Sequence, residues 1–143
     1  MPVYRLSVKV TDMNSFKPSK VLVLMAHPDD EALSCFGTLA RFSAEGSEIV
    51  IAFFTDGHQG RLNTSLESSK LINARINIID ELQVENEIVE NRKFVACVDK
   101  CIASESPSLV ITHGYANNEH HEHNILSKIV QNSIFRSELH LDL

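Results

Sequence analysis

One histidine and two aspartates stand together just after the apolar run of residues 21–25. This run is too short for a helix and has no polar face, so we predict a strand buried on both sides in a parallel sheet. Pro28 cannot donate to a β-ladder and is favoured in a first helical turn, so the strand should end just before it. His27 and Asp30 then lie three residues apart across a tight turn and can reach one point. An imidazole and a carboxylate are typical zinc ligands.

A second interpretation of this turn is a solvated helix cap. Asp29, Asp30 and Glu31 suit that role, because the positive end of the following helix stabilises acidic side chains. The cap leaves no role for His27. A catalytic zinc site normally has three protein ligands and an open water position, so the metal interpretation needs a further ligand from another strand end.

A histidine-rich segment follows a second buried-strand candidate at residues 109–112. At the start of a helix, His120 and His123 share one face, whereas His121 points elsewhere. Ligands in open α/β sheets bind at the carboxyl ends of strands, where both segments fall. A histidine-rich loop by itself is most often an exposed loop without a function, but the two segments together are far more specific for a metal site.

The two segments resemble the signature motifs of the LmbE-like or PIG-L-type family of zinc-dependent N-deacetylases, which remove acetyl groups from N-acetylated amino sugars. The first motif is residues 26–31, and the second is His, any residue, an acidic residue and His, matched here by His120, Glu122 and His123. Glu122 replaces the usual Asp and His121 the usual Pro. The resemblance covers residues 20–133.

The resemblance implies that His27, Asp30 and His123 hold Zn²⁺, or another divalent metal such as Fe²⁺. It implies that Asp29 accepts the proton of the attacking water and delivers it to the leaving amine. His120 would stabilise the tetrahedral oxyanion. The expected substrate is an N-acetylated amino sugar or its conjugate.

A third segment, residues 55–61, follows the second core strand and contains two glycines that allow close approach of a ligand. In the family the corresponding region flanks the substrate pocket, although His58 stands where many members have Glu. A flexible surface turn is an equally good interpretation. Some members bind substrate through an arginine early in the next helix; none aligns cleanly here, and neither Lys70 nor Arg75 is assigned that role.

Strand-like and helix-like apolar patterns alternate along the chain. We expect core strands at 21–25, 49–54 and 109–112, a short strand at 84–89, and helices over 32–44, 71–82, 94–102 and 125–134. This alternation predicts an α/β, Rossmann-like three-layer fold with a mostly parallel sheet and helices on both faces.

We expect an N-terminal arm or edge strand in residues 1–19 and one LmbE-like domain in residues 20–143. A chain of 143 residues buries about two-thirds of its unfolded surface, enough for a single core. Family members usually continue with further strands that build the pocket, so we expect the C-terminal part of the family fold to be absent. An uncovered sheet edge would then favour a homo-oligomer or loss of activity.

The composition argues against several other classes of protein. Nineteen acidic and 13 basic residues give a net charge of −6, which disfavours nucleic-acid binding. No stretch approaches the roughly 20 apolar residues of a membrane span, and we expect a cytoplasmic protein. The odd number of cysteines, Cys35, Cys97 and Cys101, indicates reduced thiols. A Gly-x-Gly-x-x-Gly motif after a strand is missing, which counts against nucleotide binding.

Three functions therefore stay open beside the disfavoured nucleotide binder. The leading hypothesis is a zinc-dependent deacetylase acting on an amino sugar. A metal hydrolase of the same fold with another amide substrate is the second. The third is a metal-binding but inactive domain with an assembly or regulatory role.

Overall fold

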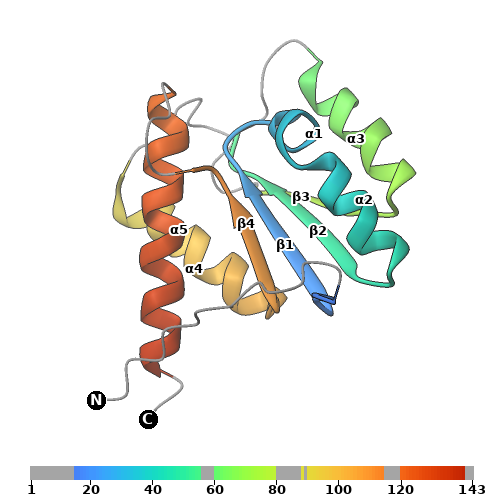
Figure 1. Ribbon diagram of the computed structural model, residues 1–143. Coiled ribbons are helices and arrows are strands. Elements are labelled where there is room, and N and C mark those ends of the chain that lie inside the picture. Colours follow the sequence, from blue (N-terminus) through green and yellow to red (C-terminus); the bar gives the residue numbers. More distant parts are fainter. Residues whose placement is uncertain (1–14, 56–59, 80–87, 89, 115–119, 141–143) are drawn as a thin grey trace.

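The computed structural model describes residues 15–55, 60–79, 88, 90–114 and 120–140, the last three without their side chains (Figure 1). Residues 1–14 of the predicted arm at residues 1–19 lie outside the described residues. So does the predicted short strand, of which only Ile88 is described.

A parallel sheet of four strands in the order β3-β2-β1-β4 forms the middle layer of the described chain. In chain order the strands are β1 (Lys20–Met25), β2 (Glu48–Phe53), β3 (Arg75–Ile78) and β4 (Leu109–Thr112). Val23 of β1 pairs with Ile51 of β2 on one side and with Ile111 of β4 on the other. Both central strands carry five consecutive buried residues, which explains their continuous apolar sequences.

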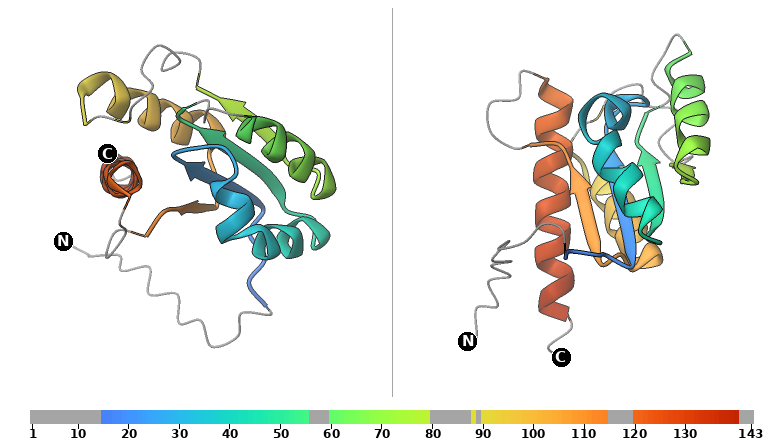
Figure 2. Two further views of the ribbon diagram at one scale, coloured as in Figure 1. Left: turned by 90° about the horizontal axis from the view of Figure 1, so that it is seen from above. Right: turned by 45° about the vertical axis from the view of Figure 1, so that its right-hand side comes forward.

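Helices cover both faces of this sheet. They are α1 (Asp30–Ser34), α2 (Phe36–Ala44), α3 (Arg61–Leu71), α4 (Arg92–Glu105) and α5 (His121–His140). Figures 1 and 2 show α1, α2 and α3 on one face, and α4 and α5 on the other. The predicted three-layer α/β fold is therefore confirmed.

Two hydrophobic clusters lie on opposite sides of the sheet, because successive strand residues point to opposite faces. Val21, Val23 and Met25 of β1 pack with Leu39 and Phe42 of α2. The alternate residues of β1 and β2 pack on α4 and α5, and this cluster includes Leu22, Leu24, Val50, Ala52, Phe94, Val98, Leu126 and Val130. The core helices predicted at 94–102 and 125–134 are thus confirmed.

The helix predicted over residues 32–44 is broken at Cys35 into α1 and α2. Leu33, expected in the core, is 85% exposed, whereas Glu31 is buried. The apolar spacing predicted one buried face for Leu33 and Leu39, but this requires a continuous helix. The break at Cys35 places the two residues in different helices, and the turn before α1 sets the direction of the first. Gly46, with φ of 96°, ends α2 as expected.

The helix predicted over residues 71–82 is wrong. Helix α3 ends at Leu71, the chain turns through Asn73 with φ of 50°, and β3 follows at Arg75. Ile76 and Ile79 pack in opposite clusters, so their spacing of three reflects two faces of a sheet and not one face of a helix. Helix α3 itself escaped prediction because its buried positions, Ser65 and Ser69, are polar.

Among the described residues, no helix combines the length and apolar character needed to cross a bilayer.

The contrast between Leu33 and Leu39 gives a direct test of this packing. Leu39→Ala should lower the free energy of unfolding by about 2–5 kcal/mol, because Leu39 is fully buried. Leu33→Ala should change it by less than about 0.5 kcal/mol, because that side chain is exposed. Urea denaturation of both variants measures the two values, and equal losses would contradict the break at Cys35.

Candidate metal centre

The two predicted motifs meet at the carboxyl edge of the sheet. The strand order reverses at β1, with β2 and β3 on one side and β4 on the other, and such a switch point is where open α/β sheets bind ligands. His27 follows the end of β1, Asp30 opens α1, and His123 lies in the first turn of α5. The fold therefore brings His123 to Asp30 and His27, which lie 93 and 96 residues before it in sequence.

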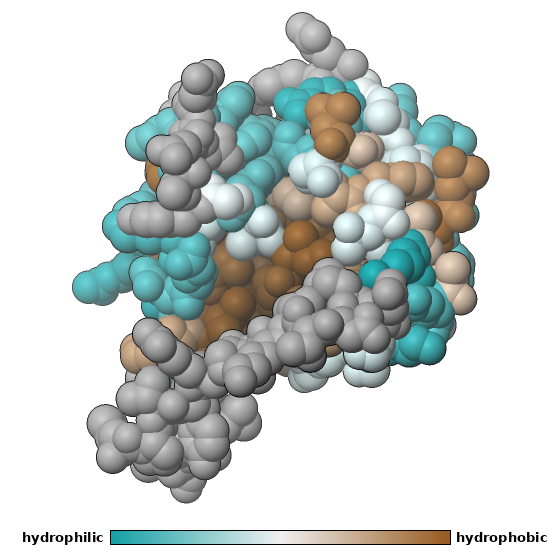
Figure 3. Space-filling model, in the orientation of Figure 1, coloured by the Kyte–Doolittle hydropathy of each residue, from teal (hydrophilic) through white to brown (hydrophobic). Residues whose placement is uncertain are grey.

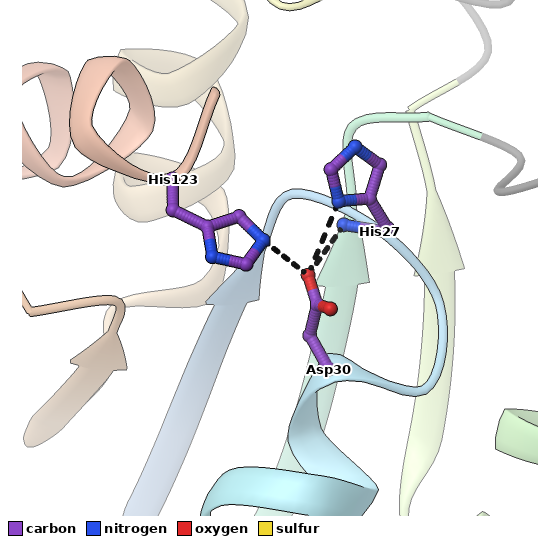
Figure 4. Close-up of side chains that lie close together, drawn as sticks. All are labelled: His27, Asp30 and His123. Atoms are coloured by element: carbon purple, nitrogen blue, oxygen red, sulfur yellow. Dashed lines mark hydrogen bonds and ion pairs between the residues drawn. The ribbon is translucent and has the colours of Figure 1, made fainter. Parts of the chain in front are cut away.

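Asp30 lies between the two histidines (Figure 4). Its Oδ2 is 3.4 Å from His27 Nδ1 and 3.2 Å from His123 Nε2. One ligand atom from each residue lies within 4.8 Å of the others. Two atoms bound at about 2.1 Å to one ion are separated by at most roughly 4.2 Å, so only a small adjustment is needed. Two imidazoles and one carboxylate are a ligand set of catalytic zinc sites, and the three residues fit such an ion.

Glu122 orients His27. Its Oε1 lies 3.1 Å from His27 Nε2, and its Oε2 accepts a hydrogen bond of 2.7 Å from the Ile88 backbone N–H. When His27 donates from Nε2 to Glu122, Nδ1 is left as the metal-binding nitrogen on the side of Asp30. The hydrogen bond to Asp30 raises the pKa of His27 against the effect of burial, and Glu122 adds to the rise. Glu122, the acidic residue of the second motif, thus orients His27 of the first motif.

The charge states of Asp30 and His123 suit metal binding. Burial opposes ionisation of Asp30, but hydrogen bonds from the His27 side chain and backbone outweigh it and lower the pKa of Asp30. Burial lowers the pKa of His123, despite the attraction of Asp30. Metal ligands must be deprotonated, and the site favours a carboxylate and a neutral imidazole at these two positions.

Asp29, the predicted base, is held by helix α3. Its backbone adopts the left-handed conformation with φ of 74°, and its N–H donates to the buried Ser65 hydroxyl at 2.7 Å. Arg61 donates hydrogen bonds to the Asp29 carboxylate from Nη2 at 2.6 Å and from Nε at 3.1 Å. This hydrogen bonding raises the pKa of Arg61. Arg61 also reaches Asp30 Oδ1 at 3.2 Å.

Arg61 is the first residue of α3, the helix that follows β2, and no arginine in this region was assigned from the sequence. The wrong prediction of a helix over residues 71–82 placed the helix start ten residues too late. The position of Arg61 directly after Gly60 could have indicated a helix start there. Lys70 instead pairs with Glu67 on the exposed side of α3, and Arg75 pairs with Glu105. The His58 prediction lies outside the described residues.

Three histidine rings are stacked at the start of α5. The His120 and His123 ring centroids are 4.6 Å apart with an interplanar angle of 21°. The His113 ring lies 3.7 Å from the His123 ring at 11°. Burial, followed by the nearby His123, lowers the pKa of His113 to about 4. His121 is exposed, as its helical position predicted.

A cavity of about 450 Å³ adjoins the site. Asp30, His113 and His123 line one part, and Met25, Cys35 and Ile111 contribute to the rest. Figure 3 shows hydrophobic surface in a hollow over β1 and β4, between α5 and the side of α1 and α2. The centre is therefore a polar cluster beside an apolar recess.

The fold and site define an α/β protein with a histidine and aspartate cluster at the switch point of a parallel sheet. Residues 22–134 match the family model described as "PIG-L: GlcNAc-PI de-N-acetylase". The chain belongs to the PIG-L, or LmbE-like, family of deacetylases.

Curated relatives match over a shorter stretch. The chain is 40% identical over 45 residues to the 1D-myo-inositol 2-acetamido-2-deoxy-alpha-D-glucopyranoside deacetylase of Actinosynnema mirum, which is 32% of this chain and 16% of that protein. A protein of that description from Saccharopolyspora erythraea is 42% identical over 45 residues, or 32% of this chain and 15% of its own. The matched stretch spans about one sixth of these relatives.

Solved structures share the fold over most of the chain. The N,N'-diacetylchitobiose deacetylase of Pyrococcus horikoshii superposes with a TM-score of 0.74 and 23% identity, over 85% of this chain and 51% of that one. The 4-carboxy-2-hydroxymuconate hydratase GalB of Pseudomonas putida gives a TM-score of 0.69 and 13% identity, over 84% and 56%. This chain thus spans little more than half of either structure.

The contact between Glu122 and His27 predicts a role in metal affinity. Glu122→Ala should weaken zinc binding about 10- to 100-fold, because His27 loses the partner that orients it. Competition with a chromogenic chelator measures the dissociation constant. Glu67→Ala, which removes an exposed glutamate paired with Lys70, is the matched control and should bind zinc like the parent. Unchanged affinity in Glu122→Ala would contradict the orienting role.

Proposed function

We propose that this chain carries the metal-binding catalytic centre of a hydrolase that removes the acetyl group from an N-acetylated amino sugar or its conjugate. The observation that supports it most is the convergence of His27, Asp30 and His123 within 4.8 Å in a chain of a deacetylase family. Asp29 and His120 lie beside this cluster, where the reaction needs a base and an oxyanion donor.

His27, Asp30 and His123 would hold Zn²⁺, or another divalent metal such as Fe²⁺. Bound there, the ion supplies Lewis acidity toward the acetyl carbonyl and lowers the pKa of water. Three protein ligands leave a position open for that chemistry, as catalytic zinc sites require.

Asp29 acts as the general base and then as the general acid. It takes the proton of the attacking water and passes it to the nitrogen of the leaving amine. Its backbone contact with Ser65 and its side-chain contacts with Arg61 hold the carboxylate beside Asp30. Positioned proton transfer of this kind contributes typically about 10²–10⁴-fold in rate.

His120 donates a hydrogen bond to the oxygen that becomes negative in the tetrahedral intermediate. Although the residue is exposed, its ring meets the His27 ring edge-on at 5.6 Å and stacks on the His123 ring at 4.6 Å, so it lies against two of the proposed metal ligands. A donor fixed in this way needs little reorganisation as charge develops.

The family and its relatives support this substrate class. Both curated relatives named above act, by their descriptions, on an acetamido sugar joined to inositol. Arg61, with a side chain 37% exposed beside the base, carries five N–H donors and is suited to bind a sugar hydroxyl or a linked anionic group while it holds Asp29.

A second candidate is a metal-binding module without turnover, with an assembly or regulatory role. The position of β4 supports it: among the described residues β4 is an edge strand, and all four of its residues are only partly buried, whereas β1 and β2 each carry five buried residues. Pairing of such edges would also produce the predicted homo-oligomer. Binding of one zinc per chain without release of amine from any acetylated sugar would favour this candidate.

The cytoplasmic location of the protein stays a prediction.

Asp29→Asn separates catalysis from metal binding. Release of free amine from N-acetylglucosaminyl-inositol and N,N'-diacetylchitobiose should fall about 10²–10⁴-fold, because the proton acceptor is lost. Bound zinc, measured by atomic emission, should stay at the level of the parent. Parent-like turnover in this variant would remove the proposed base.

Two histidine variants complete the assignment. His120→Ala should keep zinc and lose about 10²–10³-fold in turnover, through loss of the oxyanion donor. His123→Ala should lose both zinc and turnover, because it removes a ligand. If His120→Ala releases zinc and His123→Ala retains it, the two roles are reversed and the ligand set is wrong.

A further inference from the structure

We propose that His113 is a positioning residue that joins the two ligand-bearing segments of the metal centre. It holds the end of β1 through a hydrogen bond and holds the His123 ring by stacking. The inference rests on the proposed function, since it assigns a role toward the same metal site.

The first contact is with the backbone just before His27. The ladder between β1 and β4 ends at the pair Leu24 and Thr112, so the Ala26 N–H lies beyond its last rung. His113 replaces the missing partner: its Nε2 accepts the Ala26 N–H at 2.9 Å. The Ala26 carbonyl in turn accepts from the Thr55 hydroxyl at 2.9 Å.

Both backbone polar groups of Ala26 are therefore held by side chains from the neighbouring strand ends. Ala26 is fully buried, so an unpaired N–H there would carry a desolvation cost of about 1–3 kcal/mol. This cost ties the position of the His27 backbone to the presence of an acceptor at residue 113.

The second contact is with the third ligand. The His113 ring lies flat on the His123 ring, with centroids 3.7 Å apart. The His120 ring also stacks on His123, at 4.6 Å, and the His27 ring lies tilted to it at 5.5 Å. Rotation about the last side-chain bond of a histidine is soft, so the backbone of α5 does not set the plane of this ring. Stacked neighbours set it, and they direct His123 Nε2 at Asp30 Oδ2.

His113 is not itself assigned as a fourth ligand, although its Nε2 is 3.5 Å from Asp30 Oδ2. The lone pair of that nitrogen already receives the Ala26 N–H, and a metal bond would leave this buried donor unpaired. A fourth protein ligand would also close the position that a catalytic ion needs. A His113 that positions the ligands without binding the metal keeps both its hydrogen bond to Ala26 and its stack on His123.

The two contacts can be removed separately. His113→Phe keeps a flat ring for the stack and loses the acceptor, whereas His113→Gln keeps an acceptor and loses the ring. His113→Ala loses both. His121→Phe and His121→Gln are matched controls, because His121 is an exposed histidine two residues from His123.

Zinc dissociation constants from chelator competition provide a readout that needs no turnover. We expect about 10-fold weaker binding in each of His113→Phe and His113→Gln, and up to about 100-fold in His113→Ala, the range seen for residues that orient metal ligands. The absorption bands of the Co²⁺ form should change in the His113 variants and stay parent-like in the His121 variants. Thermal melts by circular dichroism confirm that each variant is folded.

Several outcomes overturn the inference. Parent-like affinity and spectra in all three folded His113 variants would show that the contacts do not position the ligands. Loss of one histidine from the coordination sphere of His113→Phe, measured by X-ray absorption, would make His113 a ligand instead. A parent chain that binds no zinc overturns both this role and the proposed function, whereas zinc binding that is insensitive to residue 113 overturns this role alone.

Discussion

The structure depends most on one carboxylate held between two imidazoles. Asp30 is nearly buried, and a charge in that environment is costly unless hydrogen bonds and opposite charge compensate for lost water. His27 supplies a backbone and a side-chain contact from the same turn, and His123 supplies another from a distant helix. The parallel sheet makes this possible, because strands β1 and β4 end side by side at the same edge. A cation bound by His27, Asp30 and His123 would also compensate the buried negative charge of Asp30.

The turn that carries Asp29 is strained, and its neighbours account for that strain. A non-glycine residue in the left-handed region costs of the order of 1–3 kcal/mol and persists only where surrounding contacts determine it. Here the contacts come from α3, through the Ser65 hydroxyl and the Arg61 guanidinium. Helix α3 buries Ser65 where it meets this polar turn, and an apolar residue at that position would leave the Asp29 N–H unpaired.

The fold by itself does not decide the reaction. The sheet and helices of this chain superpose on a chitobiose deacetylase and on a muconate hydratase with similar TM-scores of 0.74 and 0.69. Chemistry on such a scaffold is carried by the side chains at the strand ends. In this chain those are an imidazole and carboxylate turn after β1 and a group of histidines after β4. Membership of the chain in the PIG-L family supports the proposal that they carry out amide hydrolysis.

The sequence alone determined the central strands, the helices α4 and α5, and the residues that converge at the centre. Continuous apolar runs and strong helical spacing are local signals of burial, and the histidine and aspartate motifs are local in sequence. Only the tertiary structure decided that Leu33 faces solvent, that Ile76 lies in a strand, and that Arg61 and His113 belong to the site. Their roles come from contacts across the sheet edge, between segments that are distant in sequence. A polar helix such as α3 has no apolar period to reveal it, because its inner face is complementary to a polar turn that exists only once the chain has folded.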